Sequence, residues 1–481
     1  MMGRFNSLIL TVEAVFMIPA LLISLFCGDV AGVNGFIVAI LTAVGIAGIL
    51  AFLSRGAKPD FFAKEGLVCV GLSWVVMSLV GAMPFYFSGY IPSFIDALFE
   101  TVSGFTTTGA SILNDVEALS KGMLYWRSFS HWLGGMGVLV FLLAIIPVSG
   151  KSEGYTMHIL RAESPGPDVG KLVPKMRQTA AILYLVYIAL TVLNFIFLVA
   201  GKMPVFDAVC TAFGTAGTGG FGVKSDSIAG YSPYLQIVTT VFMLLFGINF
   251  SCYYLLLLRQ VKSVFKDEEL RLYLGVVFAT IALITANIYK MYSSVGEALR
   301  HSAFQVSSII TTTGFATTDF DAWPQFSKAL LLMLMLIGAC AGSTGGGMKC
   351  ARVLLIFKTM KRNINQVLHP KKVKVIKVNG KMVDEKLIAN TNAYLAVYVV
   401  IIIASFIIIS LDNLSTAANI SAVLACFNNI GPGLAEVGPM FSYSSYSVLS
   451  KCVLIFDMLA GRLEIFPILV LFNRHAWKRQ G

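Results

Sequence analysis

The sequence predicts an all-α polytopic membrane protein in which four membrane-span/pore-helix/membrane-span repeats surround a central pore, preceded by two extra transmembrane helices. Composition is the first observation behind this prediction: 57% of the 481 residues are hydrophobic and 13% are charged, with a mean hydropathy of +0.80. Soluble domains carry about 25% charged residues, so the composition excludes a soluble enzyme. The second observation is that long apolar stretches recur along the chain with Gly/Thr clusters between them.

Ten stretches are apolar enough and long enough to span a bilayer, which takes roughly 20 residues per helix. They are 7–27, 33–53, 65–87, 124–148, 178–200, 234–258, 270–292, 326–357, 387–411 and 446–473. A signal peptide would end in a small-residue cleavage site, whereas the first stretch is followed at once by the second, so we expect it to be retained.

Positive charge predicts the orientation of the spans. An even number of spans puts both termini on one side, and the loops on that side carry 27 Lys and Arg residues against 8 on the other. Because Lys and Arg are enriched in cytoplasmic loops, we expect both termini in the cytoplasm and the chain in the cell (inner) membrane. Acidic residues gather on the outer side, where they either attract cations or reflect the same bias.

Each outer loop after the second span contains a short apolar segment followed by a polar turn with glycine. At about 10 to 14 residues, the segments are too short to span the membrane and fit re-entrant pore helices. The segments occupy 95–105, 205–214, 299–310 and 416–427, and the turns occupy 106–110, 218–221, 311–315 and 428–433.

Spacing sets the register of the four copies. Asp96 precedes Gly109 by thirteen residues and Asp207 precedes Gly220 by thirteen, which favours Gly220 over Gly219 as the equivalent glycine. The equivalent glycines are therefore Gly109, Gly220, Gly314 and Gly431, the last in the most diverged copy. We expect two N-terminal transmembrane helices in 1–60 and four pore repeats in 61–160, 161–265, 266–365 and 366–481.

Four glycine turns at membrane depth indicate a pathway for a monovalent cation. Unpaired carbonyls cost several kcal/mol in lipid, whereas a ring of carbonyls can replace the hydration shell of an ion. No ring of Arg or Lys accompanies the turns, as an anion would need, and none contains the Asp or Glu of a divalent-ion site. Close helix packing also uses small residues, but four positional copies favour a central ion pore.

The motifs FTTTGAS, TGGFG, TTTGFATTD and NNIGPGL, with two spans before the first repeat, resemble the Trk/Ktr/HKT superfamily of potassium uptake proteins, specifically its bacterial TrkH branch. The resemblance covers nearly the whole chain and implies potassium uptake, with potassium as the only metal bound. It implies a filter of backbone carbonyls at Thr107, Thr108, Gly109, Thr218, Gly219, Gly220, Thr312, Thr313, Gly314, Asn429, Ile430 and Gly431. Plant relatives with serine at the first of these glycines tend to prefer sodium, so Gly109 favours potassium.

Glycines interrupt the eighth span. Five fall within twelve residues, namely Gly338, Gly342, Gly345, Gly346 and Gly347. Each costs about 1 kcal/mol in a helix, so we expect the stretch to unwind within the membrane. It is not a nucleotide-binding GxxxxGK loop, because Met348 precedes Lys349. The resemblance implies a gating loop below the filter, and a kink that serves packing is the alternative.

Arg462 lies inside the last span, where a charge costs at least ~2.5 kcal/mol and usually faces a cavity or a partner. An ion pair with Asp457 or Glu464, or a position near the cytoplasmic face, would account for it. The resemblance instead implies an arginine that projects into the pore beneath the filter, where its charge opposes cations and assists the gate.

The loop 349–386 carries 11 Lys and Arg residues, more than orientation requires, and anionic lipids would explain part of this charge. The resemblance implies that a cytosolic nucleotide-binding regulatory subunit, TrkA in bacteria, docks nearby on a membrane homodimer. The chain has no dinucleotide or Walker A motif, and its histidines and cysteines show no ligand spacing. We therefore expect no catalytic residue, no resident cofactor and no nucleic-acid partner.

A proton- or sodium-coupled secondary cation transporter, in effect a symporter, is the alternative to a gated ion channel. Glu13, Asp457 and Glu464 lie within spans and would be its candidate proton relays. A membrane enzyme would need nucleophiles, bases or metal ligands clustered at one depth, and the sequence shows none.

Overall fold

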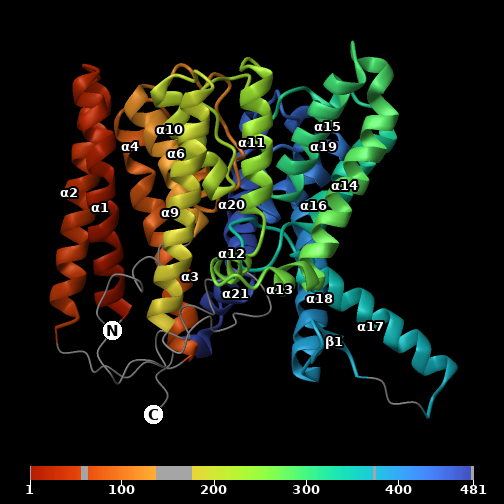
Figure 1. Cartoon of the computed structure of the whole chain (residues 1–481). Helices are drawn as coiled ribbons and strands as arrows, with labels where there is room; N and C mark the ends of the chain where they lie inside the picture. Colours follow the sequence, from red (N-terminus) through yellow and green to blue (C-terminus); the bar gives the residue numbers. More distant parts are fainter. Residues whose placement is uncertain (1, 56–62, 137–175, 372–374, 478–481) are drawn as a thin grey trace.

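The computed structural model describes residues 2–55, 63–136, 176–371 and 375–477. Helices make up almost all of this part of the chain (Figure 1), as the all-α prediction requires. The marked N-terminus, α21 and the strand β1 lie at the same, lower end of the bundle in Figure 1.

The first half of the chain begins with two long helices that pack on each other. They are α1 (Met2–Phe26) and α2 (Val30–Leu53), which lie side by side at one edge in Figure 1. The helices up to the chain midpoint are α3 (Ala63–Gly81), α4 (Met83–Phe87), α5 (Phe94–Phe105), α6 (Lys121–Gly135), α9 (Met176–Ala200), α10 (Val205–Gly217), α11 (Pro233–Phe246), α12 (Phe250–Leu257) and α13 (Val261–Lys266).

The second half repeats the alternation of long and short helices and adds one hairpin. Its elements are α14 (Glu268–Ile288), η1 (Tyr289–Met291), α15 (Val295–Ile310), η2 (Phe320–Ala322), α16 (Gln325–Ile337), α17 (Cys350–Leu368), β1 (Lys377–Val378), β2 (Lys381–Met382), α18 (Glu385–Ile409), η3 (Ser410–Asp412), α19 (Thr416–Phe427), η4 (Ala435–Val437), η5 (Tyr443–Ser445), α20 (Val448–Arg462), α21 (Phe466–Leu471) and η6 (Arg474–Ala476). The strands β1 and β2 are antiparallel, with Lys377 opposite Met382.

By length and apolar composition, six helical segments of the described chain can cross a membrane, and a seventh can if α11 and α12 form one bent span. The six are Met2–Phe26, Val30–Leu53, Glu65–Phe87, Gln178–Ala200, Glu268–Met291 and Glu385–Asp412. Each of them overlaps one of the expected spans. The expected span 124–148 is described only through Met136, and its remainder lies outside the described residues.

Two spans that we expected to be continuous are broken. The stretch 234–258 bends by 89° between α11 and α12, because Asn249 caps a new helix and Phe250 N donates to Gly342 O at 3.0 Å instead of continuing α11. The stretch 446–473 breaks between α20 and α21, where Glu464 and Ile465 both have positive φ. Pro467 explains that break, because proline lacks an N–H group and clashes with the preceding helical turn.

The four short outer helices were expected from the sequence and are present as α5, α10, α15 and α19. Serine side chains cap three of them by accepting a backbone N–H group of the first turn, namely Ser93, Ser294 and Ser415. The fourth, α10, begins after Pro204, whose fixed φ suits a helix start. Each of these helices leads directly into one of the glycine turns.

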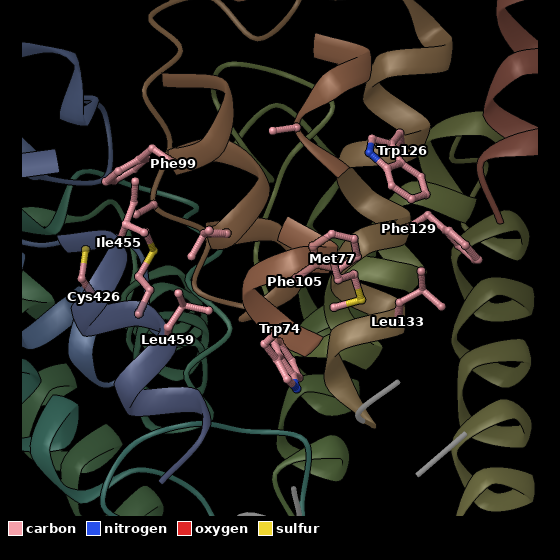
Figure 2. Packing of buried hydrophobic residues seen from close by; sticks show 14 of the residues in the cluster. Trp74, Met77, Phe99, Phe105, Trp126, Phe129, Leu133, Cys426, Ile455 and Leu459 are labelled. Carbon is pink, nitrogen blue, oxygen red and sulfur yellow. The ribbon is translucent and has the colours of Figure 1, made fainter. Parts of the chain in front are cut away.

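The core holds α5 firmly against its neighbours. Phe105, at the end of α5, meets the ring of Trp126 edge to face with centroids 6.0 Å apart, and Trp126 Nε1 donates to Gly81 O at 3.1 Å. Figure 2 shows these rings packed with Trp74 and Met77 of α3, while Phe99 lies toward Ile455 of α20. The turn after α5 therefore starts from a fixed position.

Candidate functional site

The four glycine turns share one backbone conformation. In each turn the glycine and the residue two positions before it both have positive φ. The pairs are Thr107 (56°) with Gly109 (78°), Thr218 (55°) with Gly220 (79°), Thr312 (59°) with Gly314 (82°) and Asn429 (56°) with Gly431 (96°). Positive φ is rare for a β-branched residue and persists only where the surroundings enforce it. The glycines are the four that the sequence spacing aligned.

The four turns meet in a closed ring. A Cβ atom added to each glycine would strike a backbone carbonyl oxygen of the next turn. The contacts run from Gly109 to Gly219, from Gly220 to Thr313, from Gly314 to Ile430 and from Gly431 back to Thr108, where the distance would be 2.7 Å. Segments more than 300 residues apart in sequence are thereby adjacent, and only glycine fits at the four contact points.

The fourth turn departs from the other three in its hydrogen bonds. Asn429 Nδ2 donates to Thr108 Oγ1 at 3.0 Å and to Met458 O at 2.9 Å. Tyr443 Oη donates to Gly431 O at 2.6 Å. In the first and third turns, two threonine hydroxyls of the same turn instead form a hydrogen bond with each other, with their oxygens 2.8 Å apart. The sequence divergence of the fourth copy thus has a structural counterpart.

A cavity of about 800 Å³ lies on one side of the ring. All four ring glycines line it, together with the loops that follow the turns. Glu436 also lines the cavity, and a hydrogen bond from the Ser415 hydroxyl holds the pKa of that carboxyl below its usual value. The carboxylate is therefore ionised at neutral pH and places a negative charge at the cavity wall.

The glycine-rich stretch 338–349 is non-helical, as expected, and separates α16 from α17. Gly346 N donates to Thr312 Oγ1 at 2.6 Å, and a Cβ atom on Gly346 would lie 2.5 Å from Asn428 O. This intramembrane loop, 338–349, contacts residues that precede the ring glycines, whereas the cavity is lined by residues that follow them. The loop and the cavity therefore lie on opposite sides of the ring.

Glu269, at the start of α14, ties the intramembrane loop to the start of α17. Its Oε1 accepts the backbone N–H groups of Ala341, at 2.6 Å, and Ala351, at 3.0 Å. Within the loop, the buried Lys349 donates to Gly345 O. The sequence analysis did not single out Glu269, because an acidic residue in a first helical turn ordinarily indicates only a favourable helix start.

Arg462 is almost fully buried, and its acceptors among the described residues include four oxygens. Its Nη1 reaches Thr344 O at 2.9 Å and Thr107 Oγ1 at 3.2 Å. Its Nη2 reaches Gly134 O at 2.5 Å and Gly135 O at 2.7 Å. The guanidinium group thus connects the intramembrane loop, the first turn and the end of α6.

The two acidic residues considered as ion-pair partners of Arg462 bond elsewhere. Asp457 Oδ1 accepts from Ser405 Oγ at 2.8 Å, and Glu464 forms an ion pair with Arg352. Three buried side chains that the sequence analysis did not single out as site residues, Glu100, Arg127 and His131, lie behind the first two turns. In the described part of the chain, no group of three or more His, Cys, Asp or Glu side chains is arranged to hold a metal ion.

A bundle of apolar helices around a closed ring of glycine turns, with a cavity on one side and an intramembrane loop on the other, defines a polytopic membrane transport protein. The chain belongs to the TrkH family of cation transport proteins, whose family model matches residues 33–478. The family expected from the motifs is thereby confirmed, as is a transport protein rather than an enzyme.

Several potassium transport proteins are similar to this chain over almost its whole length. The Trk system potassium uptake protein TrkH of Escherichia coli (strain K12) is 36% identical over 477 residues, which cover 98% of this chain and 97% of that protein. TrkH of Salmonella typhimurium is 35% identical with the same coverage. The crystal structure of the potassium transporter TrkH from Vibrio parahaemolyticus matches with a TM-score of 0.88 and 31% identity, covering 99% of both chains. The all-α membrane fold is confirmed by this match.

Proposed function

We propose that this protein takes up potassium across the cytoplasmic membrane through the ring formed by the four glycine turns. The observation that carries the proposal is the closed cycle of glycine-to-carbonyl contacts, which brings four carbonyl-rich segments to one place. Rings of backbone carbonyls select potassium by replacing its hydration shell. The relatives named potassium uptake proteins match this chain from end to end, which supports the same ion here.

The filter in this proposal consists of three residues from each turn, ending at the ring glycine. The pore repeats that supply them are 61–160, 161–265, 266–365 and 366–481, after the N-terminal helices of 1–60. The shared pattern of positive φ in all four turns supports this division. Potassium is the transported ion, and it is the only metal that the proposal requires.

The intramembrane loop and Arg462 form the gate in this proposal. The loop lies against the third and fourth turns through Gly345 and Gly346, and Arg462 fastens Thr344 to the end of α6. A buried positive charge beside the pathway opposes cation entry. Opening would require the loop to leave the ring and Arg462 to release Thr344.

We also propose that a cytosolic nucleotide-binding subunit of the TrkA type regulates the protein. The protein would form a homodimer with its termini in the cytoplasm. A route to the gate is available through the hairpin of β1 and β2. Asn379, at its turn, accepts from Glu268 N at 2.8 Å and donates to Asp267 Oδ2 at 2.7 Å. These acidic residues immediately precede Glu269, which holds the intramembrane loop. A partner that displaces the hairpin would therefore pull on the gate.

The coupled transporter remains the second candidate, because one of its three carboxyls has no hydrogen-bond partner in the part of the chain that the structure describes. Glu13 is buried in α1, and within the described residues neither carboxyl oxygen has a hydrogen-bond partner. Asp457 and Glu464, by contrast, are both bonded. Glu13, buried beside Gly81, is the group that a proton-coupled mechanism would use.

Rubidium-86 uptake into proteoliposomes, driven only by a potassium gradient, tests the proposal. We expect uptake without any coupling ion, competed by unlabelled potassium far better than by sodium. Uptake that requires a proton or sodium gradient would favour the coupled transporter, and Glu13→Gln would then abolish it. Equal competition by sodium would overturn a potassium-selective filter.

A further inference from the structure

Arg127 and His131 lie one helical turn apart on α6 and face the second glycine turn together. Both are buried, with exposed fractions of 3% and 0%. Both also contact Phe221, the residue that follows the ring glycine of that turn. The His131 ring centroid lies 4.2 Å from that of Phe221, and the Arg127 guanidinium lies 3.6 Å from the same ring centre.

His131 joins the first short helix to the second turn. One ring nitrogen, Nδ1, lies 2.7 Å from Gly104 O, and the other, Nε2, lies 3.3 Å from Phe221 N. A carbonyl can only accept and an amide N–H can only donate, so the imidazole is neutral and carries its hydrogen on Nδ1. A Cβ atom on Gly219 would overlap the ring, which shows that His131 fills the space directly behind the turn.

Arg127 and Glu100 form the most buried of the described ion pairs, with Nε and Oε1 2.5 Å apart. Arg127 Nη1 also donates to Gly222 O at 3.0 Å, two residues after the second ring glycine. Glu100 accepts from Ser111 Oγ at 3.0 Å and from Ile112 N at 3.0 Å, just after the first ring glycine. The pair therefore holds the outer ends of two adjacent turns at once.

The buried pair of Glu100 and Arg127 is particular to the junction between the first and second copies. Nine residues before the ring glycine, the first copy has Glu100, whereas the others have Thr211, Gln305 and Ala422. The second and third copies are joined by neutral bonds, such as Ile228 N to Ala316 O at 3.0 Å. The fourth and first copies are joined by Tyr443 N to Ser111 O at 2.8 Å, and also by the ion pair of Lys451 with Asp96 at 2.6 Å. Charge-assisted bonds are shorter and stronger than neutral ones, so the pair holds the outer ends of the first and second turns more firmly than neutral bonds would.

We infer that Glu100, Arg127 and His131 form a bracket that fixes the spacing of the first and second turns and thereby determines the preference for potassium over sodium. The inference rests on the proposed function, because it assigns a role to residues that support the proposed filter without contacting the ion. A site that discriminates between ions must hold its ligands in place through buried, fully bonded neighbours. These three are positioning residues.

The test compares rubidium-86 with sodium-22 uptake into proteoliposomes that contain equal amounts of correctly folded protein. The variants are Arg127→Lys, which keeps the charge but loses the forked contact, and His131→Phe, which keeps a ring but loses both hydrogen bonds. Trp132→Phe is the matched control, because it removes a bond on the same helix, from Trp132 Nε1 to Thr191 Oγ1 at 3.3 Å, that lies away from the turns. We expect the rubidium-to-sodium ratio to fall about tenfold in both variants and to stay unchanged in the control.

The outcomes separate the bracket from the function on which it rests. A selective wild-type protein with equally selective, folded variants would overturn the bracket and leave the proposed function intact. A wild-type protein that does not prefer rubidium would overturn the proposed function, and the bracket with it. If either variant fails to fold, Ser111→Ala is the milder change, because it removes the hydroxyl that donates to the Glu100 carboxylate and accepts from Leu113 N but keeps Arg127 and His131. We then expect a smaller loss of selectivity, and potassium should raise its melting temperature less than that of the wild type; a normal ratio and a normal shift would overturn the bracket.

Discussion

Gly109 shows most directly how one residue controls the ring. Its φ of 78° and its contact with Gly219 O leave no room for a side chain. We expect Gly109→Ser to lower the rubidium-to-sodium uptake ratio several-fold, because the added Cβ atom must push the neighbouring carbonyl aside. Gly89→Ser is the matched control, since Gly89 has a φ of 77° and no atom within 4 Å of an added Cβ. Equal ratios in both variants would remove Gly109 from the filter.

Arg462 allows the charge of the gate to be separated from its hydrogen bonds. We expect Arg462→Ala to raise basal rubidium leak about tenfold or more, because bonds to a charged donor contribute about 1.5–3 kcal/mol each and the electrostatic barrier is lost as well. Arg462→Lys keeps the barrier but cannot reach both Thr344 and the end of α6, so we expect an intermediate leak. A tight Arg462→Ala protein would show that this residue does not gate the pathway.

Residue types with a local signal were predictable from the sequence, and residues whose partners are distant were not. The ring glycines were identifiable because four copies repeat the same spacing within a short window. Glu269 and His131 were not, because their partners lie 72 and 90 residues away along the chain. Arg462 was recognised as unusual from its place in a span, yet its acceptors among the described residues come from three other segments of the chain.

At the scale of elements, the carboxylate of Glu269 helps to hold the intramembrane loop in place. Glu269 accepts one N–H group from the loop and one from the start of α17, and its removal would take away the acceptor of both. We therefore expect Glu269→Ala to loosen the loop and raise basal rubidium leak. The adjacent Glu268→Ala is the control, since Glu268 pairs with Lys358 instead of the loop. A leak equal to that of the wild type would mean that the loop is held elsewhere.

Deleting Gly345 to Gly347 tests the same element without touching Glu269. Gly345 and Gly346 form the part of the loop that lies against the third and fourth turns. A shortened loop cannot reach the ring, so we expect a raised basal cation leak, measured as rubidium-86 efflux from loaded proteoliposomes. A folded protein that is tight and inactive would contradict a gating role for the loop.

Helix breaks were predictable only where several signals coincided. Five glycines within twelve residues were enough to predict the interruption of the eighth span. The break before α21 depends on Pro467 alone, and the bend before α12 depends on an asparagine cap together with a carbonyl from the distant Gly342. Hydropathy alone treats such stretches as continuous spans.

At the scale of the whole molecule, composition and hydropathy were sufficient for the fold class, whereas the arrangement of the repeats needed three dimensions. The apolar segments identified the bundle because lipid-facing helices must be apolar along their length. The closed order of the four turns, from the first copy through the fourth and back, depends on contacts between residues as far apart in the sequence as Thr108 and Gly431. Sequence alone predicted that four copies surround an axis, but not which carbonyl each glycine meets.

The orientation of the molecule is the property that charge counting predicts and that thiol labelling can measure. Cys27 lies exposed between α1 and α2, and Cys452 is the other exposed cysteine of the described chain. In intact cells we expect a membrane-impermeant maleimide to label Cys27 in a Cys452→Ser background. We expect the hairpin of β1 and β2 in the cytoplasm, so Lys381→Cys in a protein lacking both exposed cysteines should react only after permeabilisation. The parent with neither cysteine provides the unlabelled control. An inverted topology would put the basic loop 349–386 outside the cell, against the positive-inside rule. Labelling of Lys381→Cys in intact cells would therefore overturn both the proposed orientation and the proposed docking of a regulatory subunit in the cytoplasm.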